Sequence, residues 1–364
     1  MSDPLRNAHL TDAIAMRAAS ADCSDGSLVD DIAALRDAGW LRACLPKAAG
    51  GLGWGCEPDA TMAAFEALRM LGRANLSVAR LFEGHMNAVK LVQLYAGPDL
   101  LLETWELVER GGLLGVWGAD AVGNPLTAAV QNDPFTLSGA KRFASGLGLV
   151  QRAVVTVPAD DGVQLLLVPV DEPDRSDRHG WSMSGMRATQ SGTYDFTGII
   201  LAARNRLGRP GDYFIEPFFE GGIWRYCAAH LGGAEALYYE LRAALVASNR
   251  AGDPHQESRL ETAAIARETD RLWIMRSAAG VEAAGATPPA ATLSLLAREV
   301  TETSCRTVLD QVERALGMAA FIEGSTVERM RRDLALFLCQ AAPDAKRSRA
   351  AKALVAQAIL PEFL

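Results

Sequence analysis

The stretches LSGAKRFASG (residues 137–146) and WSMSGMRATQSGTYDFTGIIL (residues 181–201) decide the fold of this chain. Between them lie two apolar runs, residues 152–157 and 163–170, which an Asp-Asp-Gly turn separates. Short apolar runs interrupted by Gly and Asp are typical of antiparallel strands. Because the sequence on either side has helical patterning, we predict a small β unit between two helical blocks.

The first block carries the start signals and the periodicity of helices. Ser27 followed by Asp30 is the pattern of a capping box, and it opens a predicted helix that ends near Gly39. Residues 61–71 and 76–95 continue with apolar positions at helical spacing, so each is predicted to form a helix.

The last block is predicted to be helical from residue 223 onward. Loop signals near residues 252–254, 285 and 342–343 divide it into segments. Several segments have Ala-rich faces, which permit close helix contacts and favour an antiparallel bundle. The predicted helices span residues 223–249, 256–284, 289–316, 326–339 and 344–359.

Composition narrows the functional class. The chain has 364 residues, 49% of them hydrophobic, and a net charge of −8, which argues against a nucleic-acid surface. Its start has no apolar signal-peptide region, and no apolar run approaches the roughly 20 residues of a membrane span. Scattered cysteines without a Cys-x-x-Cys pair predict reduced, buried thiols in a cytoplasmic protein, and no metal site. They are Cys23, Cys44, Cys56, Cys227, Cys305 and Cys339.

Several motifs, taken in order, resemble the acyl-CoA dehydrogenase superfamily. They are the turn at residues 141–146, the segment GMRATQSG at 185–192, Phe-Thr-Gly at 196–198 with LGRPG at 207–211, and the Pro- and Gly-rich loop at 45–53. The resemblance covers nearly the whole chain and implies an α+β multidomain fold. That fold has a helical N-terminal domain (1–110), a central antiparallel β domain (111–215) and a C-terminal helical bundle (216–364).

The resemblance also implies a flavin cofactor, FAD or alternatively FMN. Phe143 matches the aromatic residue that packs by the flavin ring, and Ser145 the hydroxyl residue that bonds near N5. Ala144 belongs to the same turn, whose small residues let backbone groups approach a ring closely. Trp117 and Gly118 match the segment facing the pyrimidine side, although Gly118 replaces the usual Thr. The alternative interpretation is a β-hairpin turn without a ligand.

Arg250 follows the first long helix of the bundle. The family has an Arg there that reaches the pyrophosphate of a dinucleotide, often across a subunit interface, and Arg suits this task through bidentate bonds. The alternative is a helix C-terminal Arg that opposes the macrodipole. By the same resemblance we expect a homo-oligomer, a dimer or a tetramer, joined through the bundle.

The usual catalytic base is missing. The family's Glu, eight residues after the Asp of an Arg-Asp pair, corresponds to Ala341 after Arg332-Asp333. A second family position, before an Arg in the first bundle helix, is Trp224. Glu220 lies one helical turn earlier and is interpreted as a solvated helix-start residue.

His85 is the other weak candidate for a catalytic group. It lies on an apolar helical stripe and is interpreted as a core histidine. The alternative places it in the pocket beside the flavin, where it would move protons near neutral pH.

The sequence thus predicts a flavin-dependent oxidoreductase that acts on an acyl thioester or a related small apolar substrate. Two alternatives stay open. One is a reduced-flavin and oxygen monooxygenase of the branch that includes dibenzothiophene monooxygenase, which needs no α-proton base. The other is a non-catalytic binding protein. The substrate, the choice of FAD or FMN, and the oligomer size are not determined by the sequence.

Overall fold

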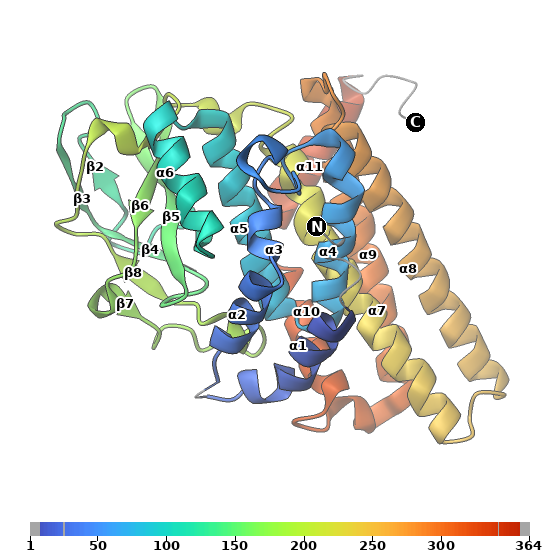
Figure 1. Ribbon diagram of the computed structural model, residues 1–364. Coiled ribbons are helices and arrows are strands. Elements are labelled where there is room, and N and C mark those ends of the chain that lie inside the picture. Colours follow the sequence, from blue (N-terminus) through green and yellow to red (C-terminus); the bar gives the residue numbers. More distant parts are fainter. Residues whose placement is uncertain (1–7, 25, 341, 357–364) are drawn as a thin grey trace.

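The computed structural model describes residues 8–24, 26–340 and 342–356. The strands lie on one side of the molecule, the N-terminal helices in the middle, and the C-terminal bundle on the other side (Figure 1). This is the α+β architecture that the sequence predicts. The N-terminal helices are α1 (Ala8–Ala21), α2 (Val29–Asp37), α3 (Trp40–Ala43), α4 (Thr61–Ala74), α5 (Leu76–Tyr95) and α6 (Pro98–Glu109).

The middle of the chain forms three small sheets. The first has the strand order β1-β5-β6-β10, the second β2-β3-β9 and the third β4-β8-β7. Their bounds are β1 (Leu113–Trp117), β2 (Thr127–Ala128), β3 (Phe135–Ser138), β4 (Ala140–Arg142), β5 (Val150–Ala159), β6 (Gly162–Pro169), β7 (Ser176–Asp177), β8 (Thr193–Asp195), β9 (Ile200–Leu201) and β10 (Arg206–Leu207).

One strand pair departs from the predicted antiparallel pattern. β5 and β6 form the expected hairpin, with Ala159 opposite Gly162 across the turn. β1, in contrast, pairs with β5 in parallel. The chain forms β2, β3 and β4 between these two strands, and such a long crossover is what a parallel pair requires.

The C-terminal bundle has its helices within a few residues of the predicted ranges. They are α7 (Trp224–Ala247), α8 (Pro254–Val281), α9 (Ala291–Leu316), α10 (Thr326–Phe337) and α11 (Pro343–Val355). Within the described ranges, none of these or the earlier helices combines the length and apolar character that a bilayer span requires. The predicted domain divisions at 110/111 and 215/216 remain predictions.

Polar side chains at the helix starts explain several of these boundaries. Asn75 accepts a hydrogen bond from the N–H of Ser77 at the start of α5, and Asp253 does the same for the first N–H groups of α8. Ser27 accepts from the N–H of Val29, whereas the predicted capping box would have Ser27 accept from the N–H of Asp30. α2 therefore begins without a side-chain cap, and the predicted capping box is wrong in detail.

The six cysteines are all free, in agreement with the expected reduced thiols. Cys44, Cys227 and Cys305 are buried as predicted. Cys23 and Cys339 are exposed, so the prediction of burial is wrong for these two residues.

Helices α4 and α7 pack with their backbones almost in contact. A Cβ atom added to Gly232 would lie 2.2 Å from the carbonyl oxygen of Arg69, and one added to Gly72 would lie 2.2 Å from that of Ala229. Only glycine fits at such a distance, since real Cβ contacts are longer than 3.0 Å. This contact joins the N-terminal helices to the bundle.

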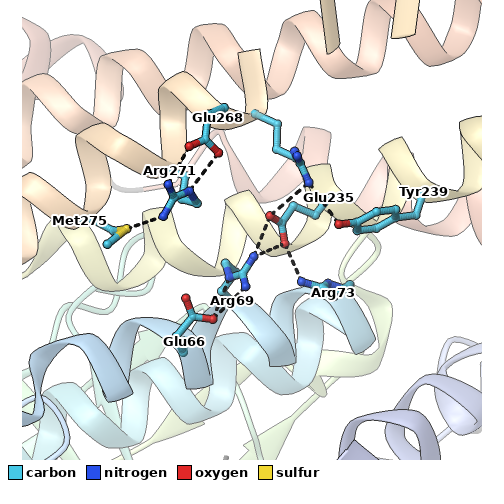
Figure 2. A network of polar contacts seen from close by, with 9 residues as sticks. Glu66, Arg69, Arg73, Glu235, Tyr239, Glu268, Arg271 and Met275 are labelled. Carbon is cyan, nitrogen blue, oxygen red and sulfur yellow. Dashed lines mark hydrogen bonds and ion pairs between the residues drawn. The ribbon is translucent and has the colours of Figure 1, made fainter. Parts of the chain in front are cut away.

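A buried carboxylate strengthens the same junction. Glu235 on α7 is 1% exposed and lies among arginines from α4 and α8 (Figure 2). Its oxygens accept from Arg69 at 2.8 Å and from Arg73 at 2.9 Å, and the Arg267 guanidinium lies 3.8 Å away. The carboxylate offsets the repulsion among three cations that the helix packing brings together.

We predict that Glu235→Ala lowers the free energy of unfolding by about 2–3 kcal/mol. This is below the usual cost of breaking a fully buried pair because the arginines are partly exposed and retain some hydration. Urea unfolding measures the change. The control is Glu268→Ala, which removes an exposed pair with Arg271 on α8 and should cost less than about 1 kcal/mol. Equal losses in the two variants would contradict this role for Glu235.

Candidate active site

Two hollows meet at the exposed ring of Phe143. The first, the polar hollow, has a volume of about 350 Å³ and is lined by Arg80, Glu83, Trp117, Arg142, Tyr226 and Lys346, among others. The second, the apolar hollow, has a volume of about 380 Å³ and is lined by Ser145, Trp181, Met183, Met186 and Phe337, among others. Arg80, Phe143 and Gln340 line both. Both volumes suit a small ligand.

The turn after β4 is held by the second sequence motif. Ala144 donates its backbone N–H to the Gly192 carbonyl, and Gly146 donates to that of Thr189 at 2.8 Å. The structure therefore joins the two quoted motifs, residues 137–146 and 181–201, in one unit. Phe143 has a φ of +56°, which is uncommon for a bulky residue, and it is 45% exposed. Backbone strain of this kind concentrates at binding sites.

A chain of three hydroxyl groups runs along the apolar hollow. The Oγ atoms of Ser145 and Ser191 are 3.0 Å apart, and Ser191 Oγ is 2.8 Å from Thr189 Oγ1. Thr189 donates its hydrogen to the Met186 carbonyl at 2.8 Å. Because each hydroxyl has one hydrogen, Ser191 must then donate to Thr189, and Ser145 must donate to Ser191. Ser145 therefore has no hydrogen to donate to a ligand in the hollow and can offer it only lone pairs.

Trp117 and Gly118 lie at the end of β1, on the wall of the polar hollow. The Trp117 ring is buried, and its Nε1–H donates to the Ser145 carbonyl at 3.1 Å, which fixes the turn from behind. Gly118 is exposed, and a Cβ atom there would meet nothing within 4 Å. The Cα of Gly118 therefore faces open space, whereas its carbonyl accepts from Lys141 and Thr156.

His85 lies in the core and lines neither hollow. Its Nε2 is 3.0 Å from the Leu41 carbonyl, and its Nδ1 accepts from the N–H of Leu114 at 3.0 Å. Burial lowers the pKa of His85 to about 4, although the hydrogen bond to Leu41 works in the opposite direction. The interpretation as a core histidine agrees with the structure, and the one as a proton carrier in the pocket does not.

Glu220 requires a correction. The sequence suggested a solvated helix-start residue, but its side chain is 4% exposed and lines the polar hollow. Lys346 donates to it at 2.9 Å, and the Arg349 guanidinium pairs with its other oxygen. Both cations come from α11, which packs on α9 and reaches the 3-10 turn Glu220–Ile223 ahead of α7, a contact that local sequence does not reveal.

The residues next to Glu220 show a similar long-range pairing. Trp224 and Arg225 both donate to the carboxylate of Glu282, which comes from the end of α8. Lys90 on α5 binds the other oxygen of Glu282 at 3.1 Å. A carboxylate does therefore lie beside the Trp224-Arg225 pair, but it is neutralised by two cations.

Comparisons with known proteins give a consistent fold. No protein-family profile matches the chain. The TdsC protein of Paenibacillus sp. A11-2, solved with FMN and indole, superposes with a TM-score of 0.83 at 20% identity over 96% of each chain. The methanesulfinate monooxygenase MsuC of Pseudomonas fluorescens superposes with a TM-score of 0.82 at 20% identity, over 98% of this chain and 97% of that one. The chain has the acyl-CoA dehydrogenase fold.

Curated relatives match this chain over only part of its length and of their own. A dibenzothiophene monooxygenase of Mycolicibacterium goodii is 24% identical over 218 residues, which are 55% of this chain and 50% of that protein. A probable FMNH2-dependent monooxygenase, SfnC of Pseudomonas putida, is 26% identical over 275 residues, which are 70% of this chain and 67% of that protein. The chain thus spans about half the length of the dibenzothiophene monooxygenase it matches.

Within the acyl-CoA dehydrogenase fold, the Arg-Asp pair has a structural task. Asp333 on α10 is 2% exposed, and its Oδ1 accepts from the backbone N–H of Met186 at 2.6 Å. Arg332 pairs with Asp22 and Glu328. The pair therefore fixes residues 185–192 against the bundle. Ala341, the family base position, lies outside the described residues.

Arg250 lies in the turn between α7 and α8, at the end of the bundle that points away from the strands (Figure 1). Its side chain is exposed and lines neither hollow. A contact with a flavin would therefore require a second copy of the chain, and both this contact and the homo-oligomer stay predictions.

The sequence interpretation missed the charged residues of the polar hollow. Arg80 and Glu83 lie on α5 beside the apolar stripe that contains His85, and a salt bridge joins them. With Lys90, they make three charges in a largely apolar helix, a signal that could have identified this wall. Arg142, Tyr226 and Lys346 carried no comparable local signal.

We predict that Asp333 gives stability a distinctive pH dependence. Burial, with a smaller contribution from Asp22, raises the pKa of Asp333 from 3.8 to about 6 despite the hydrogen bond from Met186 and the nearby arginines. Between these two pH values the folded chain binds a proton more readily than the unfolded chain, so stability falls as the pH rises. Asp333→Asn keeps the acceptor for Met186 and removes this loss.

From pH 4 to pH 7, the free energy of unfolding of Asp333→Asn should therefore gain roughly 2–3 kcal/mol relative to wild type. Asp333→Ala is the control, because it leaves the Met186 N–H unpaired and should cost about 1–3 kcal/mol at pH 4. Denaturant unfolding at several pH values measures both effects. Parallel pH profiles for wild type and Asp333→Asn would rule out the raised pKa.

Proposed function

We propose that this chain is a flavin-dependent monooxygenase that oxidises a small organic molecule with oxygen. The fold, and relatives named as monooxygenases, support this reading over the acyl thioester dehydrogenase that the sequence first suggested. Reduced flavin, when bound, supplies the two electrons by which one oxygen atom of O₂ enters the substrate and the other leaves as water. The substrate occupies the polar hollow, next to the flavin ring.

The residues present fit a flavin at the junction of the two hollows. Phe143 offers an exposed aromatic ring at the junction. Ala144 is fully buried, lines neither hollow and donates its N–H to Gly192, so it supports the turn from behind. Gly118 leaves open space on the neighbouring wall, where a Cβ atom would meet nothing within 4 Å. FMN is the preferred flavin, since one solved neighbour contains FMN and one curated relative is named for FMNH2.

The direction of the hydroxyl chain is the observation that carries the proposal. Ser145 donates its hydrogen to Ser191, because Thr189 donates to the Met186 carbonyl and Ser191 in turn donates to Thr189. Ser145 therefore presents only lone pairs, which match the N–H donor that reduced flavin, but not oxidised flavin, carries at N5. An enzyme that binds reduced flavin before the flavin reacts with oxygen benefits from binding the reduced form more tightly than the oxidised form.

The carboxylates of the described lining do not suit dehydrogenation of a thioester. Glu83 and Glu220 are the two acidic residues on the walls of the hollows. Glu83 is paired with Arg80 and accepts from Asn87, and Glu220 is paired with two cations from α11. A base that takes an α-proton contributes about 10²–10⁴-fold to rate, and a carboxylate neutralised in this way is a poor one.

We predict that the protein binds reduced FMN at least about tenfold more tightly than oxidised FMN, which corresponds to about 1.4 kcal/mol. Anaerobic titration followed by fluorescence or calorimetry measures both affinities. Thr189→Val removes the acceptor of Ser191, which is then free to donate to Ser145, so the preference should shrink toward unity. Equal affinity of wild type for both flavins would contradict the proposal.

Two further measurements separate the alternatives. Ser145→Trp should exclude FMN from a folded protein, and unchanged occupancy would remove the turn from the site. Bound flavin should not be bleached by acyl-CoA in the absence of oxygen, whereas bleaching would restore the dehydrogenase reading. A folded wild-type protein that binds neither form of FMN would support the non-catalytic alternative.

A further inference from the structure

The polar hollow holds an excess of positive charge. Its walls and the groups paired with them include six cations, Arg80, Lys90, Arg142, Arg225, Lys346 and Arg349, and three carboxylates, Glu83, Glu220 and Glu282. The chain as a whole carries a net charge of −8. A positive cavity in a negative protein concentrates anions locally, because low-dielectric walls focus the field.

Arg142 is the cation of this set that has no carboxylate partner among the described residues. Each of the three carboxylates is already engaged, Glu83 by Arg80, Glu282 by Arg225 and Lys90, and Glu220 by α11. The Arg142 guanidinium lies 4.7 Å above the ring of Phe143, at the junction of the hollows, and its side chain is exposed. Stacking on a ring leaves the in-plane N–H groups free for an anion.

A second observation on the same walls also indicates a ligand. Tyr226 is 7% exposed and Arg225 is 3% exposed, yet the hydroxyl hydrogen of Tyr226 and the Nε–H of Arg225 have no acceptor in the described structure. Leaving such a buried group unpaired costs about 1–3 kcal/mol. Burial holds the pKa of Tyr226 well above its ordinary value, although Arg298 lowers it through its charge and a hydrogen bond. Because arginine only donates, the hydroxyl keeps its own hydrogen for an acceptor. A ligand oxygen in the hollow would satisfy it.

We propose that the polar hollow selects a substrate that carries an anionic oxygen group, such as a carboxylate or a sulfur oxyanion, and that Arg142 determines this specificity. Arg142 binds the anionic group at the flavin side, and the Tyr226 hydroxyl donates to a second oxygen of the substrate. This inference rests on the proposed function for the reaction, but not for the binding of the anion. It predicts a preference for charged over neutral molecules of equal size.

Benzoate and benzamide are suitable probes because they share shape and size and differ in charge. Their affinities for the full-length protein are measured by calorimetry at low salt, without flavin and with FMN. Wild type should bind benzoate at least about tenfold more tightly than benzamide. Arg142→Gln should bring the two affinities within about twofold, whereas Arg110→Gln, at an exposed arginine outside both hollows, should leave the preference intact.

The Tyr226→Phe variant tests the second contact. It removes one hydroxyl and no charge. Because benzoate has the second oxygen that benzamide lacks, the variant should weaken benzoate binding more than benzamide binding, while benzoate remains the tighter ligand. Equal affinity of wild type for the two probes, or an unchanged preference in Arg142→Gln, would overturn the proposal.

The phosphate of FMN is another anion that Arg142 could bind, and riboflavin separates the two cases. If Arg142 held this phosphate, Arg142→Gln would reduce FMN affinity to that of riboflavin and leave the benzoate preference intact, which overturns the inference. If no flavin binds but the benzoate preference remains, only the proposed function fails. If flavin binds and the preference is absent, only the anion specificity fails.

Discussion

The hydrogen bond from the Met186 N–H to the buried Asp333 carboxylate joins the segment at residues 185–192, which contributes to the apolar hollow, to α10 of the bundle. It fixes residues 185–192 against α10, where a Cβ atom on Gly185 would lie 2.3 Å from the Arg332 carbonyl oxygen. The Met186 carbonyl in turn accepts from Thr189 and from the Trp181 ring nitrogen. The position of Ser145, and hence the chemistry of the apolar hollow, therefore follows from a contact made by the bundle.

The polar hollow depends on a different kind of interaction. Its walls come from α5, the end of β1, the turn after β4, the start of α7 and α11, and ion pairs join several of the helical parts to one another. Glu282 joins the end of α8 to α5 and α7, and Glu220, in the 3-10 turn ahead of α7, joins that turn to α11. These pairs neutralise most of the charges of the hollow. Among the described residues that line it, Arg142 is the cation without a carboxylate partner, and its position in the sequence does not predict this.

Local patterns predicted the local features well. The helix at residues 76–95 and the hairpin around Gly162 agree with the structure, because apolar periodicity and turn residues act over a few positions. The turn at Phe143 was identified through residues that are adjacent in the sequence. Three features were not predictable from local patterns. The pairing of β1 with β5 and the burial of Glu220 each depend on a partner far along the chain. The third, Arg142, depends on the absence of a carboxylate partner among the described residues.

The glycine contact between α4 and α7 limits how this site can change. α5, which carries Arg80 and Glu83, follows α4 after a single residue, and α7 carries Arg225 and Tyr226. With Gly72 and Gly232 pressed against carbonyl groups of the facing helix, the two walls of the polar hollow can neither slide nor separate without losing this contact. New substrates would therefore be accommodated by exchanging side chains within a cavity of fixed width, and enzyme engineers should leave the helix framework unaltered.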